Sequence, residues 1–242
     1  MPAFGISGER FMDHICLSPR LQMVADFVPP CACAADIGTD HGYLPIWLLQ
    51  NGVIRSAIAA DIHAGPLANA RQSAAAYDLE ERFRFVQADG LRFPDAQAVD
   101  VVTVAGMGGE TICAILAAAP WLRQGKQLVL QPQSKVPELT DWLWRNGFTI
   151  EDAALCRDAG KRYLALRVLG QTAAQAYTLE QLLLRRADPL LPEYLTDEIG
   201  RQTRARAGMA HAKQIPATEL AALDARLSQL QACLKEVQTW QS

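Results

Sequence analysis

Short apolar runs alternate with helical patterns over the first two thirds of the chain. The strand-like runs are CAADIG, SAIAADI, FRFVQAD, VDVVTVAG and KQLVLQP, and the helical patterns between them include LPIWLLQNG, PLANARQSAAAYD, GETICAILAAAPWL and VPELTDWLWRNG. Fully apolar runs such as VVTVA suit strands that are buried on both faces of a parallel sheet. The alternation therefore predicts a doubly wound α/β fold with right-handed crossovers.

Two further patterns flank this alternation. Ser18 and Pro19 form an N-cap followed by proline at the first helical position, which predicts a helix over SPRLQMVADFV that ends before Pro29. The segments FTIEDAALCRDAG and KRYLALRVLG follow each other without a helix between them. They predict an antiparallel hairpin that closes one end of the sheet.

The pattern changes after Gly170, where strand signals stop and helical segments are interrupted by three prolines. In the last segment the spacings alternate between three and four residues, as in a coiled-coil seam, at Leu220, Leu223, Leu227, Leu230, Leu234 and Val237. A partner helix is expected to run antiparallel from about Glu193 to Lys213. We therefore divide the chain into an α/β domain at residues 1–170 and a helical, coiled-coil domain at 171–242.

Composition narrows the class of protein only slightly. The 242 residues are half hydrophobic, and 23 basic against 26 acidic side chains give a net charge of -3, which neither selects nor excludes an RNA partner. No signal peptide or membrane span is recognisable, so we expect a cytoplasmic protein. The six cysteines lack metal-site spacing, so we expect free thiols and no bound metal.

The stretch AADIGTDHGYLP places Gly38 and Gly42 where a strand ends and a helix begins. Dinucleotide-binding folds use such a turn for a pyrophosphate, with the spacing G-x-G-x-x-G. Here Asp40 stands at the second glycine position, and a carboxylate would repel a phosphate by roughly a kcal/mol at contact in water. The turn therefore argues against NAD.

Acidic residues end successive strands at Asp36 and Asp40, at Asp61, and at Asp89. S-adenosylmethionine carries a sulfonium, an ammonium, ribose hydroxyls and an adenine amino group, all of which suit carboxylates. Asp61 lies 23 residues after Gly38, near the interval at which an acid reaches ribose hydroxyls in this fold class. Asp89 would serve the adenine amino group, with Ile62 against the ring. Each acid taken alone is also a common cap or turn residue.

In the run VVTVAGMGGE, Gly106 and Gly108 have no side chains. They lie at the carboxyl edge of the predicted sheet, where an acceptor should meet the methyl donor. The alternative is a plain helix-entry loop. Gln131, at the end of the next strand, either offers hydrogen bonds to a base edge or ends the strand. His41 either donates to the substrate or bonds the local backbone.

The motifs ADIGTDHGYLP, GMGGETI, LVLQPQS, WLWRNGFTIEDAAL and GKRYLALRV, in this order and followed by a helical hairpin, resemble the bacterial tRNA (adenine-22-N1)-methyltransferase family, TrmK. The resemblance implies a Rossmann-like class I methyltransferase domain, a C-terminal coiled coil that helps to grip tRNA, and methyl transfer from S-adenosylmethionine to N1 of an adenine. By motif, Asp40 falls at the methyl-transfer site. The cofactor set is expected to comprise Asp36, Gly38, Thr39, His41, Asp61, Ile62, Asp89, Gly90, Gly106 and Met107.

N1 of neutral adenine can attack a sulfonium methyl directly, so placement matters more than a strong base. We expect Asp40 to accept from the 6-amino group and to offset the charge that develops on the base. The expected RNA contacts are Tyr43, Gly108, Gln131, Lys161, Arg162, Arg201 and Arg204, although the cations of RQTRARAGMAHAK also suit a solvated helix face.

Two other functions remain open from the residues. One is methyl transfer to a small molecule or protein, with the helical hairpin used for dimerisation. The other is a non-catalytic module whose coiled coil binds a protein. The oligomeric state is undetermined by sequence, with a monomer favoured.

Overall fold

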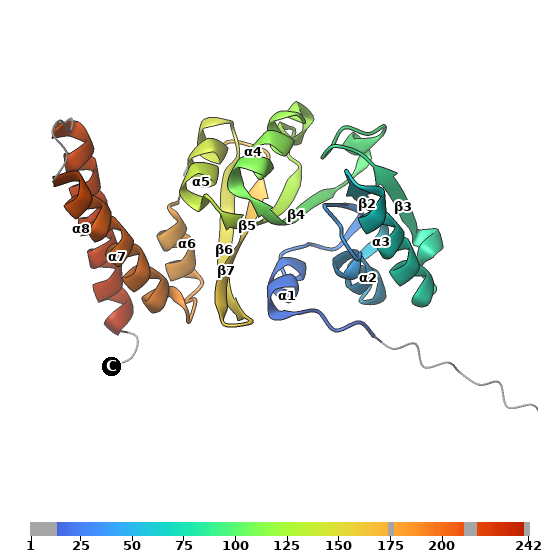
Figure 1. Cartoon of the computed structure of the whole chain (residues 1–242), viewed down its shortest axis with the longest axis horizontal. Coiled ribbons are helices and arrows are strands. Elements are labelled where there is room, and N and C mark those ends of the chain that lie inside the picture. The colour runs from blue at the N-terminus through green and yellow to red at the C-terminus, as the bar shows by residue number, and fades with distance from the viewer. Residues whose placement is uncertain (1–13, 174–176, 211–216, 240–242) are drawn as a thin grey trace, which may run out of the picture.

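The structure is a computed structural model that describes residues 14–173, 177–210 and 217–239. A sheet of seven strands in the order β3-β2-β1-β4-β5-β7-β6 forms its centre (Figure 1). The strands are β1 (Cys31–Ile37), β2 (Ile54–Asp61), β3 (Phe83–Gln87), β4 (Val101–Gly108), β5 (Gln127–Ser134), β6 (Thr149–Asp158) and β7 (Lys161–Leu169). The first five pair in parallel, and β7 is antiparallel to both β5 and β6. The expected doubly wound sheet and its terminal hairpin are confirmed.

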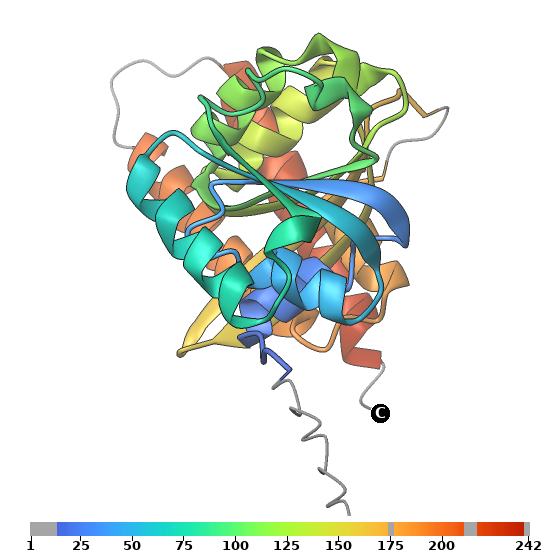
Figure 2. The ribbon, with the colours of Figure 1, turned by 90° about the vertical axis from the view of Figure 1, so that its right-hand side faces the viewer.

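Helices cover both faces of this sheet (Figure 2). On one face lie α1 (Pro19–Ala25), α2 (Tyr43–Gln50) and α3 (Ala64–Ala76), and on the other lie α4 (Gly109–Ala117) and α5 (Val136–Arg145). Strand side chains alternate between the two layers: Val101 and Val129 join the cluster that contains α1 and α2, whereas Val102 and Leu128 join the cluster that contains α4 and α5. This burial on both faces explains why these strands are apolar throughout.

Local signals in the sequence account for the helix starts. The Ser18 side chain accepts from the Leu21 N–H, and Pro19 occupies the first turn of α1, as expected. Thr178 and Gln181 form a reciprocal capping box at the start of α6 (Leu179–Arg185).

The C-terminal region consists of α6 and a helical hairpin of α7 (Leu191–Ala210) and α8 (Ala217–Gln238). Of the six positions of the expected seam, Leu227, Leu230 and Val237 are buried, and the other three are half-buried. The expected partner helix is also present, although its predicted end at Lys213 lies outside the described residues. Across the hairpin, Arg206 pairs with Asp224.

The helical region shares its hydrophobic cluster with the sheet. Leu179 and Leu183 of α6 belong to the same cluster as Leu155 of β6 and Leu164 of β7. Helix α6 therefore joins the hairpin to the β6–β7 end of the sheet, at the left of Figure 1. Within the described ranges, the helices lack the combination of length and apolarity that crossing a membrane demands.

Candidate active site

The glycine turn follows β1 at the carboxyl edge of the sheet. Gly38 has φ +76° and Gly42 has φ +69°, in the left-handed region that glycine adopts without strain. The N–H groups of Gly38 and Thr39 both donate to the Ala60 carbonyl, at 2.8 and 3.3 Å, and the Gly42 N–H donates to the Thr39 carbonyl at 2.8 Å. These three amides are used inside the fold, so they do not form a phosphate cradle.

One cavity of about 250 Å3 lies on the β2–β3 side of this turn, and we call it the cofactor-side cavity. Ile62 stands out there because 54% of it is exposed, and it is one of three large hydrophobic side chains that are exposed among the described residues. The predicted cofactor residues that line this cavity are Gly38, Asp61, Ile62, Asp89, Gly90 and Met107. The structure thus brings together six residues that come from four different strand ends.

The two carboxylates of this cavity differ in their exposure and in their partners. Asp61 is nearly buried, and its Oδ1 accepts from the His63 N–H at 2.8 Å, which holds the side chain in place. Asp89 is exposed and pairs with Arg92 at 3.0 Å. A ligand would meet a fixed acid at Asp61 and would have to exchange an exposed ion pair at Asp89.

A second cavity of about 340 Å3 lies on the other side of the turn, and we call it the acceptor-side cavity. Asp40 is exposed there, in the left-handed conformation with φ +50°, and its Oδ1 lies 3.7 Å from the His41 Nε2. The rings of His41 and Tyr43 stack with centroids 5.3 Å apart and an interplanar angle of 18°. The predicted residues that line this cavity are Asp36, Gly38, Thr39, Asp40, His41, Tyr43 and Gly106. It offers a carboxylate beside a flat ring surface.

Asp36 also lines the acceptor-side cavity, but it is buried at the end of β1. The Thr103 hydroxyl of β4 donates to its Oδ1 at 2.6 Å. Burial raises the pKa of the Asp36 carboxyl, and this hydrogen bond opposes part of the increase. A cationic ligand would stabilise the ionised form of this carboxyl.

The two cavities meet at Gly38, which lines both of them. A Cβ placed on Gly38 would lie 2.2 Å from the Met107 Cε. Any side chain larger than hydrogen at this position would therefore collide with Met107 at the junction of the cavities.

Gln131 was expected to face a base, but the structure gives it another position. It is 0% exposed, and its Oε1 accepts from the Gly106 N–H at 3.2 Å and from the Arg20 Nη1 at 2.9 Å. Its Nε2 donates to the Pro132 carbonyl. Gln131 therefore lies in the interior and holds the Gly106 loop in place through the hydrogen bond from the Gly106 N–H. Sequence analysis had no signal for the role of Arg20 in this loop, because Arg20 and Gln131 are 111 positions apart.

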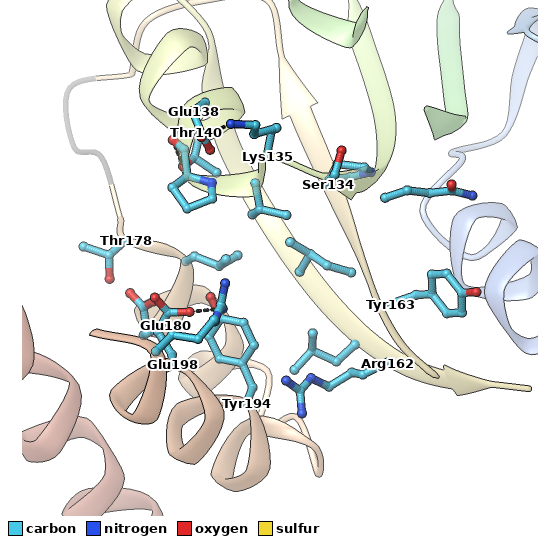
Figure 3. A pocket seen from close by; sticks show the side chains of 18 of the residues that line it. Ser134, Lys135, Glu138, Thr140, Arg162, Tyr163, Thr178, Glu180, Tyr194 and Glu198 are labelled. Atoms are coloured by element: carbon cyan, nitrogen blue, oxygen red, sulfur yellow. Dashed lines mark hydrogen bonds and ion pairs between the residues drawn. The ribbon is translucent and has the colours of Figure 1, made fainter. Parts of the chain in front are cut away.

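A third cavity, of about 820 Å3, lies between the sheet and the C-terminal helices (Figure 3). We call it the interhelical cavity. Gly108 lies near it, with its Cβ direction 3.2 Å from the Ser134 hydroxyl. Lys161 lines it and is exposed, whereas Arg162 is only 17% exposed and binds Glu193 and Asp197. Arg162 thus fastens β7 to α7.

The two predicted cations of α7 also differ. Both are exposed, but Arg201 binds the buried Glu198 and lines the interhelical cavity, whereas Arg204 does not line that cavity. Both border a smaller hollow of about 350 Å3 together with Arg162. No cluster of metal-ligating side chains is found among the described residues.

Comparison with known protein families shows the general class of enzyme to which the chain belongs. A family model described as a methyltransferase domain matches residues 17–166. The chain therefore belongs to the methyltransferases, with the seven-stranded Rossmann-like sheet of that class.

More specific relatives define the family within this class. The tRNA (adenine(22)-N(1))-methyltransferase of Bacillus subtilis is 36% identical over 156 residues, which cover 64% of this chain and 66% of the relative. The crystal structure of TrmK, the m1A22 tRNA methyltransferase of B. subtilis, superposes with a TM-score of 0.77 at 27% identity, covering 90% of this chain and 99% of that one. A Streptococcus pneumoniae protein described as a putative tRNA (m1A22) methyltransferase, solved in complex with S-adenosyl-L-methionine, gives 0.73 at 30% identity, covering 90% and 100%. This chain is a member of the tRNA (m1A22) methyltransferase family, TrmK.

Proposed function

We propose that the protein transfers the methyl group of S-adenosylmethionine to N1 of adenine 22 in tRNA. The observation that carries the proposal is the pair of cavities that meet at Gly38, one lined with acids and an exposed Ile62, the other with Asp40 beside stacked rings. Membership of the TrmK family supports the substrate and the position. The proposal includes a cytoplasmic location, because most tRNA is found in the cytoplasm.

The residues of the cofactor-side cavity fit S-adenosylmethionine better than a dinucleotide. The amides of the glycine turn are already bonded within the fold, and Asp40 would repel a phosphate. Asp61 would hold the ribose hydroxyls and Ile62 would cover the adenine ring. The buried Asp36, which lines the acceptor-side cavity beyond Gly38, would pair with the methionine ammonium. Gly38 lines both cavities, so the reactive end of the cofactor would lie beside it.

When bound, S-adenosylmethionine supplies an electrophilic methyl group on a sulfonium, and transfer leaves a neutral thioether and a positive charge on the base. Asp40 would accept a hydrogen bond from the 6-amino group and thereby direct N1 toward Gly38. Tyr43, 43% exposed and stacked on His41, would support one face of the adenine. The Asp40 carboxylate would also stabilise the charge on the methylated base.

The test uses the purified protein, labelled S-adenosylmethionine and an unmodified tRNA transcript, followed by digestion to nucleosides. Labelled 1-methyladenosine is expected, and its loss in a transcript with guanosine at position 22 would locate the target. Labelling of another nucleoside, or no labelling of RNA while the cofactor binds, would refute the proposed reaction.

Asp40→Ala tests the catalytic assignment. Turnover should be abolished, while the Kd for S-adenosylmethionine stays within about tenfold of wild type. Asp78→Ala is the matched control, because Asp78 is also exposed and left-handed, with φ +54°, but lines neither cavity. If Asp40→Ala abolishes cofactor binding, Asp40 is a cofactor residue instead.

A further inference from the structure

The interhelical cavity has a size and a position that the methyl-transfer site does not account for. It lies between the end of β5, the start of α5, β7 and the three C-terminal helices. Its volume, about 820 Å3, is within the range of small-ligand sites and can hold a nucleotide. Figure 3 shows Ser134, Lys135 and Thr140 on one side, facing Glu180, Tyr194 and Glu198 on the other.

Glu180 of α6 gives this cavity an unsatisfied acceptor. Its side chain is only 5% exposed, and Oε1 accepts from the Arg226 guanidinium at 2.6 Å. Its Oε2 is buried and has no hydrogen-bond partner among the described residues. A buried carboxylate oxygen without a donor is costly, so a ligand N–H at this position would remove a penalty as well as form a bond.

The neighbouring groups do not supply the missing donor. The nearby donors of Arg201 and Gln202 bind the Glu198 carboxylate instead. Burial, reinforced by Glu180 and Glu198, raises the pKa of Tyr194, so the phenol stays neutral and adds a polar edge to an aromatic wall.

The rim of the cavity carries groups that suit the rest of a nucleotide. Trp144 is 37% exposed, and it joins Tyr43 and Ile62 as the large hydrophobic side chains that stay exposed among the described residues. Tyr43 lines the acceptor-side cavity and Ile62 the cofactor-side cavity, so each of the three marks a different cavity. An exposed indole is a stacking surface for a base. The cavity lining includes five basic side chains against three carboxylates, and Lys161 is exposed at its edge for a phosphate.

The interhelical cavity also adjoins the acceptor-side cavity at one residue. Gln133, beyond the middle of β5, lines both the interhelical and the acceptor-side cavities. A strand of RNA whose adenine enters the acceptor-side cavity would therefore pass the mouth of the interhelical cavity.

We propose that the interhelical cavity binds a second nucleotide of the tRNA, directly adjacent to the methylated adenosine, and selects a base with an exocyclic amino group. The inference rests on the proposed function. The amino group donates to the Glu180 Oε2, the base packs against Trp144, and Lys161 contacts the phosphate. Adenine, cytosine and guanine satisfy this site, whereas uracil places a carbonyl oxygen where the carboxylate requires a donor.

The test compares tRNA transcripts that carry each of the four bases at each of the two positions flanking the target. For the wild-type protein, uridine at one of these positions should lower kcat/KM by about tenfold or more, mainly through KM. Glu180→Gln keeps the size of the side chain but replaces one acceptor by a donor. It should raise KM for the natural tRNA and remove or reverse the discrimination against uridine at that same position, with the Kd for S-adenosylmethionine unchanged.

Glu81→Gln is the control for loss of one negative charge, since Glu81 is exposed and lies next to β3 at the other end of the sheet. It should keep wild-type KM and base preference. If Glu180→Gln does not fold, Trp144→Ala decides, because its side chain is on the rim; it should raise KM for tRNA several-fold at unchanged kcat.

The inference is overturned if wild type accepts all four bases equally at both positions, or if a folded Glu180→Gln keeps the wild-type preference. It is also overturned if Trp144→Ala keeps the wild-type KM. All these outcomes presuppose that wild type forms 1-methyladenosine, so a failure of the proposed function would be recognised separately, by the absence of that product.

Discussion

Replacing Gly38 by alanine adds one methyl group at the junction of the two small cavities. The new Cβ would lie 2.2 Å from the Met107 Cε, far inside van der Waals contact, and the backbone there has φ +76°. Two separate costs follow: left-handed strain on an alanine, and displacement of Met107.

The chain contains a control that separates these costs. Gly52 has φ +67° but no atom within 4 Å of its Cβ direction, so Gly52→Ala should show the strain alone, about 1–2 kcal/mol. Because the Met107 contact involves the end of a flexible side chain, we expect the extra cost of Gly38→Ala to be near the lower end of the 1–3 kcal/mol typical of overpacking, about 1 kcal/mol. For a chain of this size, each kcal/mol corresponds to a Tm lower by about 2–4 °C.

The assays are denaturant unfolding and calorimetric titration with S-adenosylmethionine. Gly38→Ala should be about 1 kcal/mol less stable than Gly52→Ala. It should also bind the cofactor at least about tenfold more weakly, because the new methyl group displaces Met107, which lines the cofactor-side cavity. Combining Gly38→Ala with Met107→Ala should cost less than the sum of the single changes, because the contact is removed while the strain stays. Equal stability of the two alanine variants together with wild-type cofactor affinity would refute the assignment of Gly38 to the junction.

Two further predictions concern Asp36 and the loop after β5. Burial raises the pKa of Asp36 in the folded protein, so its ionisation costs stability progressively between the ordinary carboxyl pKa and the raised one, and in full above the raised one. Asp36→Asn should therefore be more stable than wild type at pH 7, with the difference shrinking toward pH 4, and it should lose cofactor affinity. Thermal unfolding across this pH range checks the sign, and a difference that grows in acid would contradict it. Gly109→Ala would place a Cβ 2.5 Å from the Lys135 carbonyl oxygen and 3.0 Å from that of Ser134, both backbone atoms, and should cost about 1–3 kcal/mol. Gly65→Ala, in α3 with open space around it, should be neutral or slightly stabilising in the same unfolding assay, and equal stability of the two variants would contradict the close packing at Gly109.

The fold was predictable because its signals are local. Apolar runs buried on both faces marked β4 and β5, the missing helix between β6 and β7 indicated a hairpin, and the three-four spacing of leucines located the inner side of α8. The acids of the candidate site were predictable for a related reason. In a parallel sheet the carboxyl ends of neighbouring strands meet at one edge, so Asp36, Asp61 and Asp89 had to converge there once the topology was known.

The partner of each side chain was decided only by the tertiary structure. Gln131 and Arg162 are residue types that commonly contact RNA. In the structure, however, Gln131 accepts from the Gly106 N–H, and Arg162 binds Glu193 and Asp197 of α7. Likewise the free oxygen of Glu180 depends on Arg226, which is 46 positions away in the sequence. Periodicity reports which face of an element is buried, but the pairing of polar groups depends on how distant elements pack. The sequence thus determined the helices and strands, their order along the chain, and the acids at the carboxyl edge of the sheet. The packing of the helical hairpin against the sheet decided which charged side chains pair within the protein and where the interhelical cavity opens.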